Sequence, residues 1–226
     1  MIEQYFRQGV RFLWNKPGDA TGALSGEIVS SKGVPTPLTY DGLDGHRQAV
    51  DPVLLMVHAS QVLGLAKGAN VRHAWLDYAP GRTAQLPCGG ADILSGYMSG
   101  CLIARGTYGG AMSAFHVGTI DGNAGANRTV KQAFAKALPA DATGFFPNAA
   151  WTRGEIGNIQ GRLGSSGGTP NIFALVTAAG AFHSVLMIPV QDPQWTDKTG
   201  RKYWCVGGVK PVQAMNRVRL MASLLQ

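Results

Sequence analysis

The sequence predicts an α+β fold, and two observations support this prediction. The 226 residues include 31 glycines and 12 prolines, and only 15% of the residues are charged, which favours short strands and loops over a helical bundle. Apolar strand-like runs also alternate irregularly with a few helical segments, without the regular βαβ order of a Rossmann fold. A chain of this length can bury one substantial core. We therefore expect a single catalytic domain over residues 1–226, with a loop-rich N-terminal elaboration at residues 1–49 and a core at residues 50–226.

The N-terminal half is expected to contain short strands and one helix. Residues 5–14 form an ambiguous first element. Asp51 and Pro52 are typical of an N-cap and a first helical position, so a helix is predicted from there to Lys67, before Gly68. The other expected elements are a strand within residues 26–30, a strand at residues 71–78 and a loop at residues 80–90.

The C-terminal half is expected to contain two helices and several strands. A helix is predicted over residues 128–138, because Val130, Phe134 and Leu138 would share one face and Asn127 would cap it. Residues 139–170 are rich in Gly, Asn, Ser and Thr, and are predicted to form long surface loops around the mouth of the functional site. The remaining expected elements are a hairpin over residues 171–178 and 181–190, a strand at residues 203–206 and a helix over residues 212–225.

The most informative stretch joins two short apolar strands through a glycine-rich connection. Residues 98–105 and 111–119 flank Gly106-Thr107-Tyr108-Gly109-Gly110, which has hairpin length. A turn centred between Tyr108 and Gly109 would place Cys101 directly opposite His116. Directly opposed residues hold their Cβ atoms about 4.5–5.5 Å apart on one face. A thiolate nucleophile and its general base need this proximity, whereas a shift of one residue would separate them.

The residues before Cys101 favour a functional role for this thiol. Gly100 allows unusual backbone dihedrals, so a turn can deliver Cys101 to the start of its strand. A strand end beside a loop is a common place for a catalytic residue. The alternative is that Cys101 is a small core hydrophobe and His116 an ordinary strand histidine.

At these residues the sequence resembles the catalytic domain of the cytotoxic necrotizing factors. The resemblance lies in Ser99-Gly100-Cys101 at the start of an apolar strand and in Phe115-His116-Val117-Gly118-Thr119 on the next. That domain belongs to a superfamily of glutamine deamidases, which includes the dermonecrotic toxin transglutaminase domain, the chemotaxis deamidase CheD and the Burkholderia lethal factor. The resemblance covers residues 94–119, about a tenth of the chain.

The resemblance implies a sandwich of mixed β-sheets flanked by helices, and a toxin or virulence effector that converts a target glutamine to glutamate. Cys101 would attack the carboxamide carbon and His116 would transfer the protons, without a cofactor or a metal. An amine in place of water would give transglutamination. Family members orient the histidine through a third element, often a backbone carbonyl. The candidates for positioning His116 or stabilising the oxyanion are Ser95, Tyr97, Ser99, Gly100 and Asp121.

The resemblance also implies a protein substrate with an exposed glutamine, such as a Rho-type GTPase or a translation factor of a host cell. A bacterial target is a further option. We expect a monomer that is secreted or injected and acts in the cytoplasm of the target cell. Residues 1–8 lack the layout of a signal peptide, and no apolar run reaches about eighteen residues, so no membrane span is expected.

Two other classes of function remain open. One is a different Cys–His thiol hydrolase, such as a papain-like protease, which would place Cys101 at the N-terminus of a helix. The other is a non-enzymatic binding module in which Cys101 and His116 only pack.

Cysteine, histidine and charge patterns point to no second site. Cys88, Cys101 and Cys205 are expected to be reduced, although a Cys88–Cys205 disulfide is an alternative. Basic residues are dispersed, and the closest cluster, residues 198–202, has the turn composition of a solvated loop. The net charge of +7 therefore favours an acidic protein partner over nucleic acid. The histidines outside the dyad are scattered and do not predict a metal site: His46, His58, His73 and His183.

Overall fold

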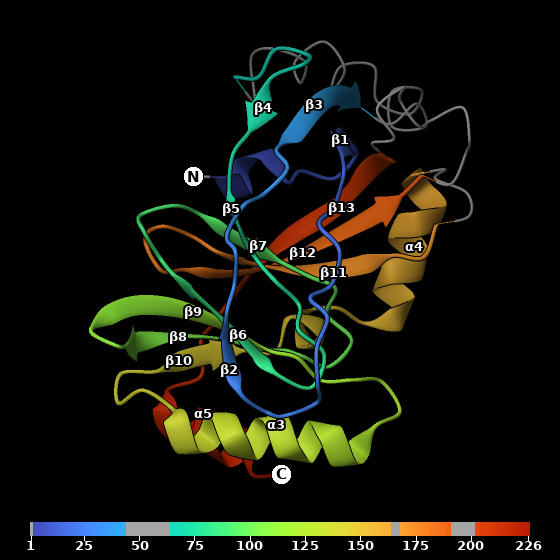
Figure 1. Cartoon of the computed structure of the whole chain (residues 1–226). Coiled ribbons are helices and arrows are strands. Elements are labelled where there is room, and N and C mark those ends of the chain that lie inside the picture. Colours follow the sequence, from blue (N-terminus) through green and yellow to red (C-terminus); the bar gives the residue numbers. More distant parts are fainter. Residues whose placement is uncertain (1, 44–63, 164–167, 191–201) are drawn as a thin grey trace.

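The computed structural model describes residues 2–43, 64–163, 168–190 and 202–226. These residues form an α+β fold in which an eight-stranded mixed sheet stacks on a five-stranded mixed sheet (Figure 1). Three α-helices of the described part of the chain lie on the outside of the two sheets. The predicted α+β class, with mixed sheets flanked by helices, is confirmed.

The large sheet curls so that its two edge strands follow one another in the sequence. In spatial order the strands are β4 (Asn70–Val71), β3 (Leu38–Leu43), β1 (Val10–Trp14), β13 (Lys202–Val212), β12 (Phe182–Pro189), β11 (Asn171–Val176), β7 (Ile93–Ser95) and β5 (Ala74–Leu76). Only Arg72 and His73 lie between the two edge strands, β4 and β5, along the chain. Neighbouring strands are antiparallel except β5 and β7, which are parallel.

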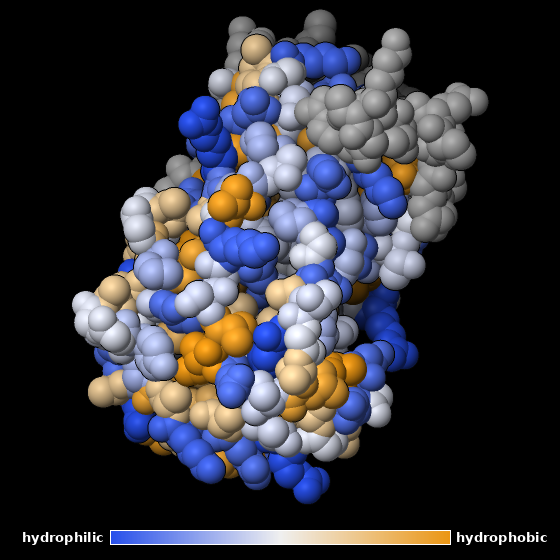
Figure 2. Space-filling model, in the orientation of Figure 1, coloured by the Kyte–Doolittle hydropathy of each residue, from blue (hydrophilic) through white to orange (hydrophobic). Residues whose placement is uncertain are grey.

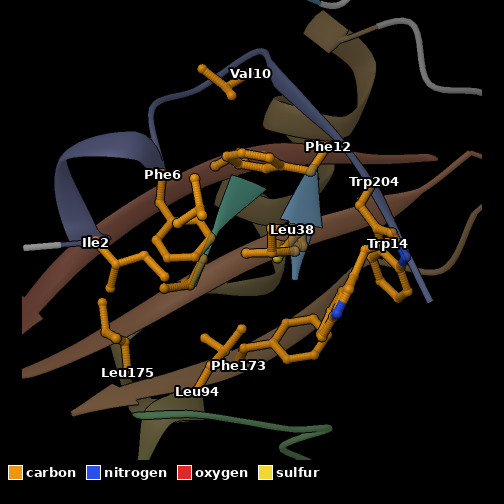
Figure 3. Close-up of a cluster of buried hydrophobic side chains, with 14 of the residues drawn as sticks. Ile2, Phe6, Val10, Phe12, Trp14, Leu38, Leu94, Phe173, Leu175 and Trp204 are labelled. Carbon is orange, nitrogen blue, oxygen red and sulfur yellow. The ribbon is translucent and has the colours of Figure 1, made fainter. Parts of the chain in front are cut away.

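The concave face of the large sheet encloses the first hydrophobic core, which we call the aromatic core (Figure 3). Its centre is Trp14, whose ring lies 5.5 Å from the rings of Phe173 and Trp204 and 5.6 Å from that of Trp75. Aromatic pairs at such distances contribute roughly 0.5–1.5 kcal/mol each beyond the burial of their surface. The 3-10 helix η1 (Ile2–Tyr5) and Phe6 close one end of this core.

The small sheet lies between the large sheet and two helices. Its strands, in spatial order, are β10 (Thr143–Phe145), β8 (Leu102–Tyr108), β9 (Ala111–Val117), β6 (Thr83–Pro87) and β2 (Ile28–Ser30). Helices α3 (Ala124–Ala137) and α5 (Arg217–Leu224) pack on its outer face, where Phe115 meets Phe134. The 3-10 helix η3 (Pro147–Ala150) and helix α4 (Arg153–Leu163) instead cover β12 and β13 of the large sheet.

The second core lies between the two sheets, and we call it the inter-sheet core. Side chains alternate along each strand, so β11 sends Phe173 into the aromatic core and Ala174 into the inter-sheet core. The small sheet contributes Ala84 and Ile103 to the same layer. Cys101 lies in this layer too, beside Ile103, and this placement brings the predicted nucleophile between the sheets.

Several predicted elements are confirmed, with shifted ends. The hairpins β8–β9 and β11–β12 form, and a strand is present at β2. The helix with Val130 and Phe134 on its buried face begins earlier than predicted, because Asn123 caps it by accepting from the Ala126 backbone N–H at 3.0 Å. Asn127 instead bonds to the backbone of Ile120. The predicted C-terminal helix begins five residues later, at α5, and the strand predicted at residues 203–206 is the longer β13.

Other predictions are wrong, because distant strands recruit segments without a strong local pattern. The loop predicted at residues 80–90 contains β6, which pairs with β9 and β2. The strand predicted at residues 71–78 is divided between β4 and β5. The loop-rich residues 1–49 supply β1 and β3, two inner strands of the large sheet. Most of the helix predicted over residues 51–67 lies outside the described residues, and residues 64–67 are not helical.

The region predicted as long loops, residues 139–170, contains β10, η3 and α4. The glycines of α4 obscure its apolar spacing. Its N-terminus carries a capping box that could have revealed the helix: Thr152 Oγ1 accepts from the Glu155 backbone N–H at 3.2 Å, and Glu155 Oε2 accepts from the Thr152 N–H at 3.3 Å.

Candidate functional site

The β8–β9 hairpin places Cys101 and His116 on the same face of the small sheet, but not directly opposite one another. His116 pairs with Ile103, because Gly109 and Gly110 alone form the turn. Both glycines have positive φ, 58° and 82°, as a type I′ turn requires. The predicted register was therefore wrong by two residues. Side chains repeat with a period of two, so the shift keeps both residues on one face, at a diagonal spacing of about 7–8 Å.

Ser95 of the large sheet holds the imidazole of His116 across the inter-sheet core. The Ser95 hydroxyl donates its only proton to the Leu76 carbonyl at 2.7 Å. Ser95 Oγ also lies 2.8 Å from His116 Nδ1 and has no second proton to donate, so it accepts a hydrogen bond from Nδ1. Nδ1 therefore carries the proton of the imidazole. The bond fixes the tautomer in which Nε2 has a free lone pair, as a general base requires. Ser95, one of the predicted positioning residues, thus contacts the predicted base.

The free lone pair of His116 is buried and unused. The side chain is fully buried, and this burial lowers the pKa of His116 to about 3. Within the described part of the chain, Nε2 has no hydrogen-bond partner. Leaving a buried polar atom unpaired costs roughly 1–3 kcal/mol. Such an atom on the face that also holds a thiol points to a role in chemistry rather than in stability.

Cys101 is a protonated thiol in this structure. Its side chain is only 1% exposed, and burial raises the pKa of the thiol above its usual value. Hydrogen bonds from Thr119 and from the Ser99 backbone oppose this effect but are weaker than it. The Cys101 thiol lies 3.8 Å from the Thr119 carbonyl, to which it donates, and 3.5 Å from Thr119 Oγ1. The resting dyad is therefore a neutral thiol and a neutral imidazole, not an ion pair.

The backbone at Gly100 delivers Cys101 to this position. Gly100 has φ of +126°, a conformation that side chains rarely adopt. A Cβ at this residue would meet Thr119 Oγ1 at 3.6 Å, an ordinary contact, so dihedral strain rather than space requires glycine here. The sequence analysis noted that Gly100 allows unusual backbone dihedrals, and the structure places one there.

Tyr78 is a member of the site that the sequence analysis missed. Its ring centroid lies 5.3 Å from that of His116, and its hydroxyl donates to the Thr119 carbonyl at 2.7 Å. Burial, followed by the nearby Cys101, raises the pKa of Tyr78 to about 12. Tyr78 follows β5 in an irregular segment, so no periodic pattern in the sequence marks it.

The other candidates lie at the edge of the site. Tyr97 is 36% exposed and packs against Phe173 and under the ammonium group of Lys16. Ser99 is exposed and contributes its backbone to the Cys101 thiol. Asp121, another candidate for positioning His116, is exposed in the turn after β9, whereas Ser95 contacts His116 Nδ1.

The connection between β1 and β2 packs against the inter-sheet core, and we call residues 15–26 the strap (Figure 1). Ala20 packs against the core, and its N–H donates to the Tyr78 carbonyl at 2.8 Å. The Arg82 guanidinium donates to the Thr21 carbonyl at 2.6 Å. Lys16 anchors the other end, with its ammonium 4.4 Å from the Tyr97 ring centroid. The strap therefore covers the part of the inter-sheet core beside Tyr78 and Tyr97.

The surface around the strap is mixed in character. On the face drawn in Figure 2, hydrophobic residues form separate groups with hydrophilic residues between them. Exposed apolar side chains such as Leu24 of the strap and Val34 are ordinary on protein surfaces.

The remaining chemical groups do not form a second centre in the described ranges. Cys88, Cys101 and Cys205 are not joined to one another by disulfides, and no three His, Cys, Asp or Glu side chains there converge as metal ligands. None of the helices described is both long enough and apolar enough to cross a membrane. His46, His58 and nearly all of the basic residues 198–202 lie outside the described residues.

Comparisons with protein families, with curated proteins and with solved structures find no match for this chain. The resemblance to the glutamine deamidases therefore rests on residues 94–119 alone, and the function has to be argued from the geometry of the site.

Proposed function

We propose that this protein is a protein-glutamine deamidase in which Cys101 is the nucleophile, His116 the general base and Ser95 the residue that positions the base. One observation carries the proposal. Ser95 fixes the proton of His116 on Nδ1, and the bare, buried Nε2 lies on the same sheet face as the Cys101 thiol. Nucleophile, base and orienting group are the three parts that thiol-dependent acyl transfer needs.

The reaction follows from these roles. His116 Nε2 takes the Cys101 proton while the sulfur attacks the carboxamide carbon of a glutamine, and a tetrahedral oxyanion forms. The imidazolium returns the proton to the departing nitrogen, the C–N bond breaks and ammonia leaves a thioester. Water, deprotonated by the same Nε2, attacks the thioester and releases glutamate and the thiol.

The neutral resting pair limits when the charges appear. Burial disfavours both the thiolate and the imidazolium, since it raises the pKa of Cys101 and lowers that of His116. Proton transfer is therefore coupled to attack, when the oxyanion forms beside the imidazolium and compensates its charge. The thiol is protected from oxidation until substrate arrives, because the thiolate is the reactive form.

Burial of Cys101 supports a protein substrate over free glutamine. With 1% exposure, the thiol is reached only after its cover moves. Binding of a protein surface can supply the free energy for such a displacement, whereas a single amino acid has few contacts to offer. A net charge of +7 favours an acidic surface on that partner. The resemblance suggests a host GTPase or translation factor and a secreted or injected effector.

The three alternative functions agree with the geometry of the site to different degrees. A papain-like site would place the cysteine at a helix N-terminus, but Cys101 precedes strand β8. A transglutaminase would use the same thioester and differ only in the acceptor. A binding module offers no reason for a histidine of fixed tautomer on the sheet face that also holds a thiol.

The test is incubation of the purified protein with a eukaryotic lysate and, separately, with a bacterial lysate, followed by ammonia measurement and peptide mass analysis. We expect a gain of about one dalton at a glutamine of a discrete protein, as hydrolysis of a primary amide requires. Cys101→Ser abolishes the change, whereas Cys88→Ser, which alters a half-buried thiol, retains it. Equal changes with wild type and Cys101→Ser, or none in either lysate, contradict the proposal.

A further inference from the structure

A hydrogen-bonded polar pair, the Tyr78 hydroxyl and the Thr119 carbonyl, lies next to the Cys101 thiol and has no role in the reaction proposed for Cys101 and His116. The Thr119 carbonyl accepts from the Tyr78 hydroxyl at 2.7 Å, and the Cys101 thiol points at the same oxygen at 3.8 Å. Thr119 follows β9, and its carbonyl takes no part in a sheet ladder. A donor, the Tyr78 hydroxyl, and an acceptor, the Thr119 carbonyl, thus lie beside the nucleophile and are bonded to each other.

The chemistry of this pair matches that of a primary carboxamide. A carboxamide presents an acceptor, its carbonyl oxygen, beside a donor, its NH₂ group. The Tyr78 hydroxyl and the Thr119 carbonyl present the complementary donor and acceptor. A carboxylate or an ester has no N–H and would leave the Thr119 oxygen unpaired in a buried site.

We propose that the Tyr78 hydroxyl and the Thr119 carbonyl form the carboxamide-recognition site, with Tyr78 as the side-chain donor of the oxyanion hole. On binding, the hydroxyl turns from the Thr119 oxygen to the substrate carbonyl oxygen, and the freed Thr119 oxygen accepts a substrate N–H. One hydrogen bond within the protein is exchanged for two to the substrate. This inference rests on the proposed function and names the group that the site selects.

Two features prepare Tyr78 for this role. Its ring packs on the imidazole of His116 at 5.3 Å with 35° between the planes, so the hydroxyl is held in place relative to the base. The raised pKa of Tyr78, about 12, keeps the hydroxyl protonated and able to donate across the neutral range. Preorganised donors of this kind stabilise the oxyanion without reorganisation during the reaction.

The arrangement also distinguishes substrate from product. After hydrolysis, a glutamate carboxylate would place a negative oxygen against the Thr119 carbonyl, where the substrate had an N–H. Sites built to bond a substrate N–H reject analogues that lack it far more strongly than apolar pockets reject a missing methylene. The product is therefore bound more weakly than the substrate and is released.

The test compares Tyr78→Phe with wild type, both in a Cys88→Ser background, in two assays. The first is deamidation of β-casein, a glutamine-containing unfolded protein, followed by ammonia release. The second is labelling of Cys101 by methyl methanethiosulfonate, a thiol reagent without a carbonyl group. We expect Tyr78→Phe to lower kcat for deamidation about 10²–10³-fold and to leave the labelling rate of Cys101 unchanged. Tyr108→Phe, at an exposed tyrosine of β8, is the control and retains both rates.

Each other outcome overturns the inference in a distinguishable way. If Tyr78→Phe deamidates within threefold of the wild-type rate, the proposed role of Tyr78 is contradicted and the proposed function is not. A parallel fall in deamidation and labelling also contradicts it, because Tyr78 would then act through the thiol and His116. A wild-type protein that is labelled at Cys101 but deamidates neither β-casein nor any protein of the two lysates contradicts the proposed function, and the carboxamide site with it.

Discussion

The aromatic core and the inter-sheet core lie on opposite faces of β7 and β11, and each has a buried histidine. His73 lies beside the aromatic core, with its ring 6.1 Å from that of Trp14 (Figure 3 shows Trp14 in this core). His116 lies in the inter-sheet core. Burial lowers the pKa of His73 to about 4 and that of His116 to about 3. A depressed histidine pKa therefore does not by itself distinguish a functional site from a packed core.

The neighbours of the two histidines make the distinction. The rings nearest to His73 are Trp14 and Trp75. His116 instead has a serine that fixes its tautomer, a tyrosine on its ring and a thiol on the same sheet face. Burial prepares a neutral base in both cores, but only the inter-sheet core supplies a nucleophile for it.

The largest effect that sharpens this comparison is expected from Ser95→Ala. The change removes the acceptor that fixes His116 Nδ1 and leaves the tautomer undetermined. We expect deamidation to fall about 10–100-fold, the equivalent of one lost buried hydrogen bond of roughly 1–3 kcal/mol. Turnover of β-casein measures it, and Ser95→Thr, which keeps the hydroxyl, restores part of the rate.

Ser184→Ala is the matched control for Ser95→Ala. Ser184 is also buried and bridges two groups in the same manner: it accepts from Trp151 Nε1 and donates to the Pro147 carbonyl, both at 2.8 Å. We expect a similar loss of thermal stability in both variants but a loss of turnover in Ser95→Ala only. Equal turnover in the two variants would remove Ser95 from the mechanism.

A second effect is expected at Gly100, where the backbone delivers Cys101. Gly100→Ala forces a side chain into a left-handed conformation, at a cost of roughly 1–3 kcal/mol. This strain destabilises the protein and displaces the Cys101 thiol, so turnover and the denaturation midpoint both fall. Gly157→Ala, in the exposed middle of α4, is the control, and it stabilises the protein by roughly 0.5–1 kcal/mol. An unchanged Gly100→Ala protein would show that the conformation at Gly100 is not required.

A third effect is the pH dependence of stability, which both histidines are expected to share. Below about pH 6.5, the ordinary pKa of histidine, the unfolded chain binds protons at His73 and His116. In the folded protein, His73 binds a proton only near pH 4 and His116 only near pH 3. Stability therefore falls as pH falls through this window, by up to about 1.4 kcal/mol per pH unit for each histidine. Urea denaturation between pH 4 and 7 measures the slope. His73→Phe makes it shallower, and a slope equal to that of wild type would contradict the burial of His73 as a neutral group.

The sequence singled out residues of the candidate site more readily than their surroundings. Local patterns drew attention to Cys101, His116 and Gly100, since a hairpin and its glycines act over a few residues. The register was wrong because Gly109 and Gly110 form the whole turn. The sequence could not single out Ser95 from the other candidates for positioning His116, because the contact between the two residues joins the two sheets.

The surroundings depend on contacts between distant segments. Strand β6 forms because it pairs with β9 and β2. Strands β1 and β3 form because β1 pairs with β13 on one side and with β3 on the other. Tyr78 comes close to Cys101, through the Thr119 carbonyl that both contact, only when distant segments are assembled. Periodicity within the sequence does not record such pairings, whereas the missed helix α4 had a local signal in its capping box.

The protonation state of His116 tests the account most directly, and ¹⁵N NMR of the histidine-labelled protein measures it without any substrate. We expect Nδ1 to carry the proton at pH 7, Nε2 to carry none, and this state to persist below pH 5 because burial lowers the pKa of His116 to about 3. Ser95→Ala should mix the two tautomers. A protonated Nε2 at pH 7, whether as imidazolium or as the other tautomer, would contradict the role of His116 as the base that Ser95 prepares for Cys101.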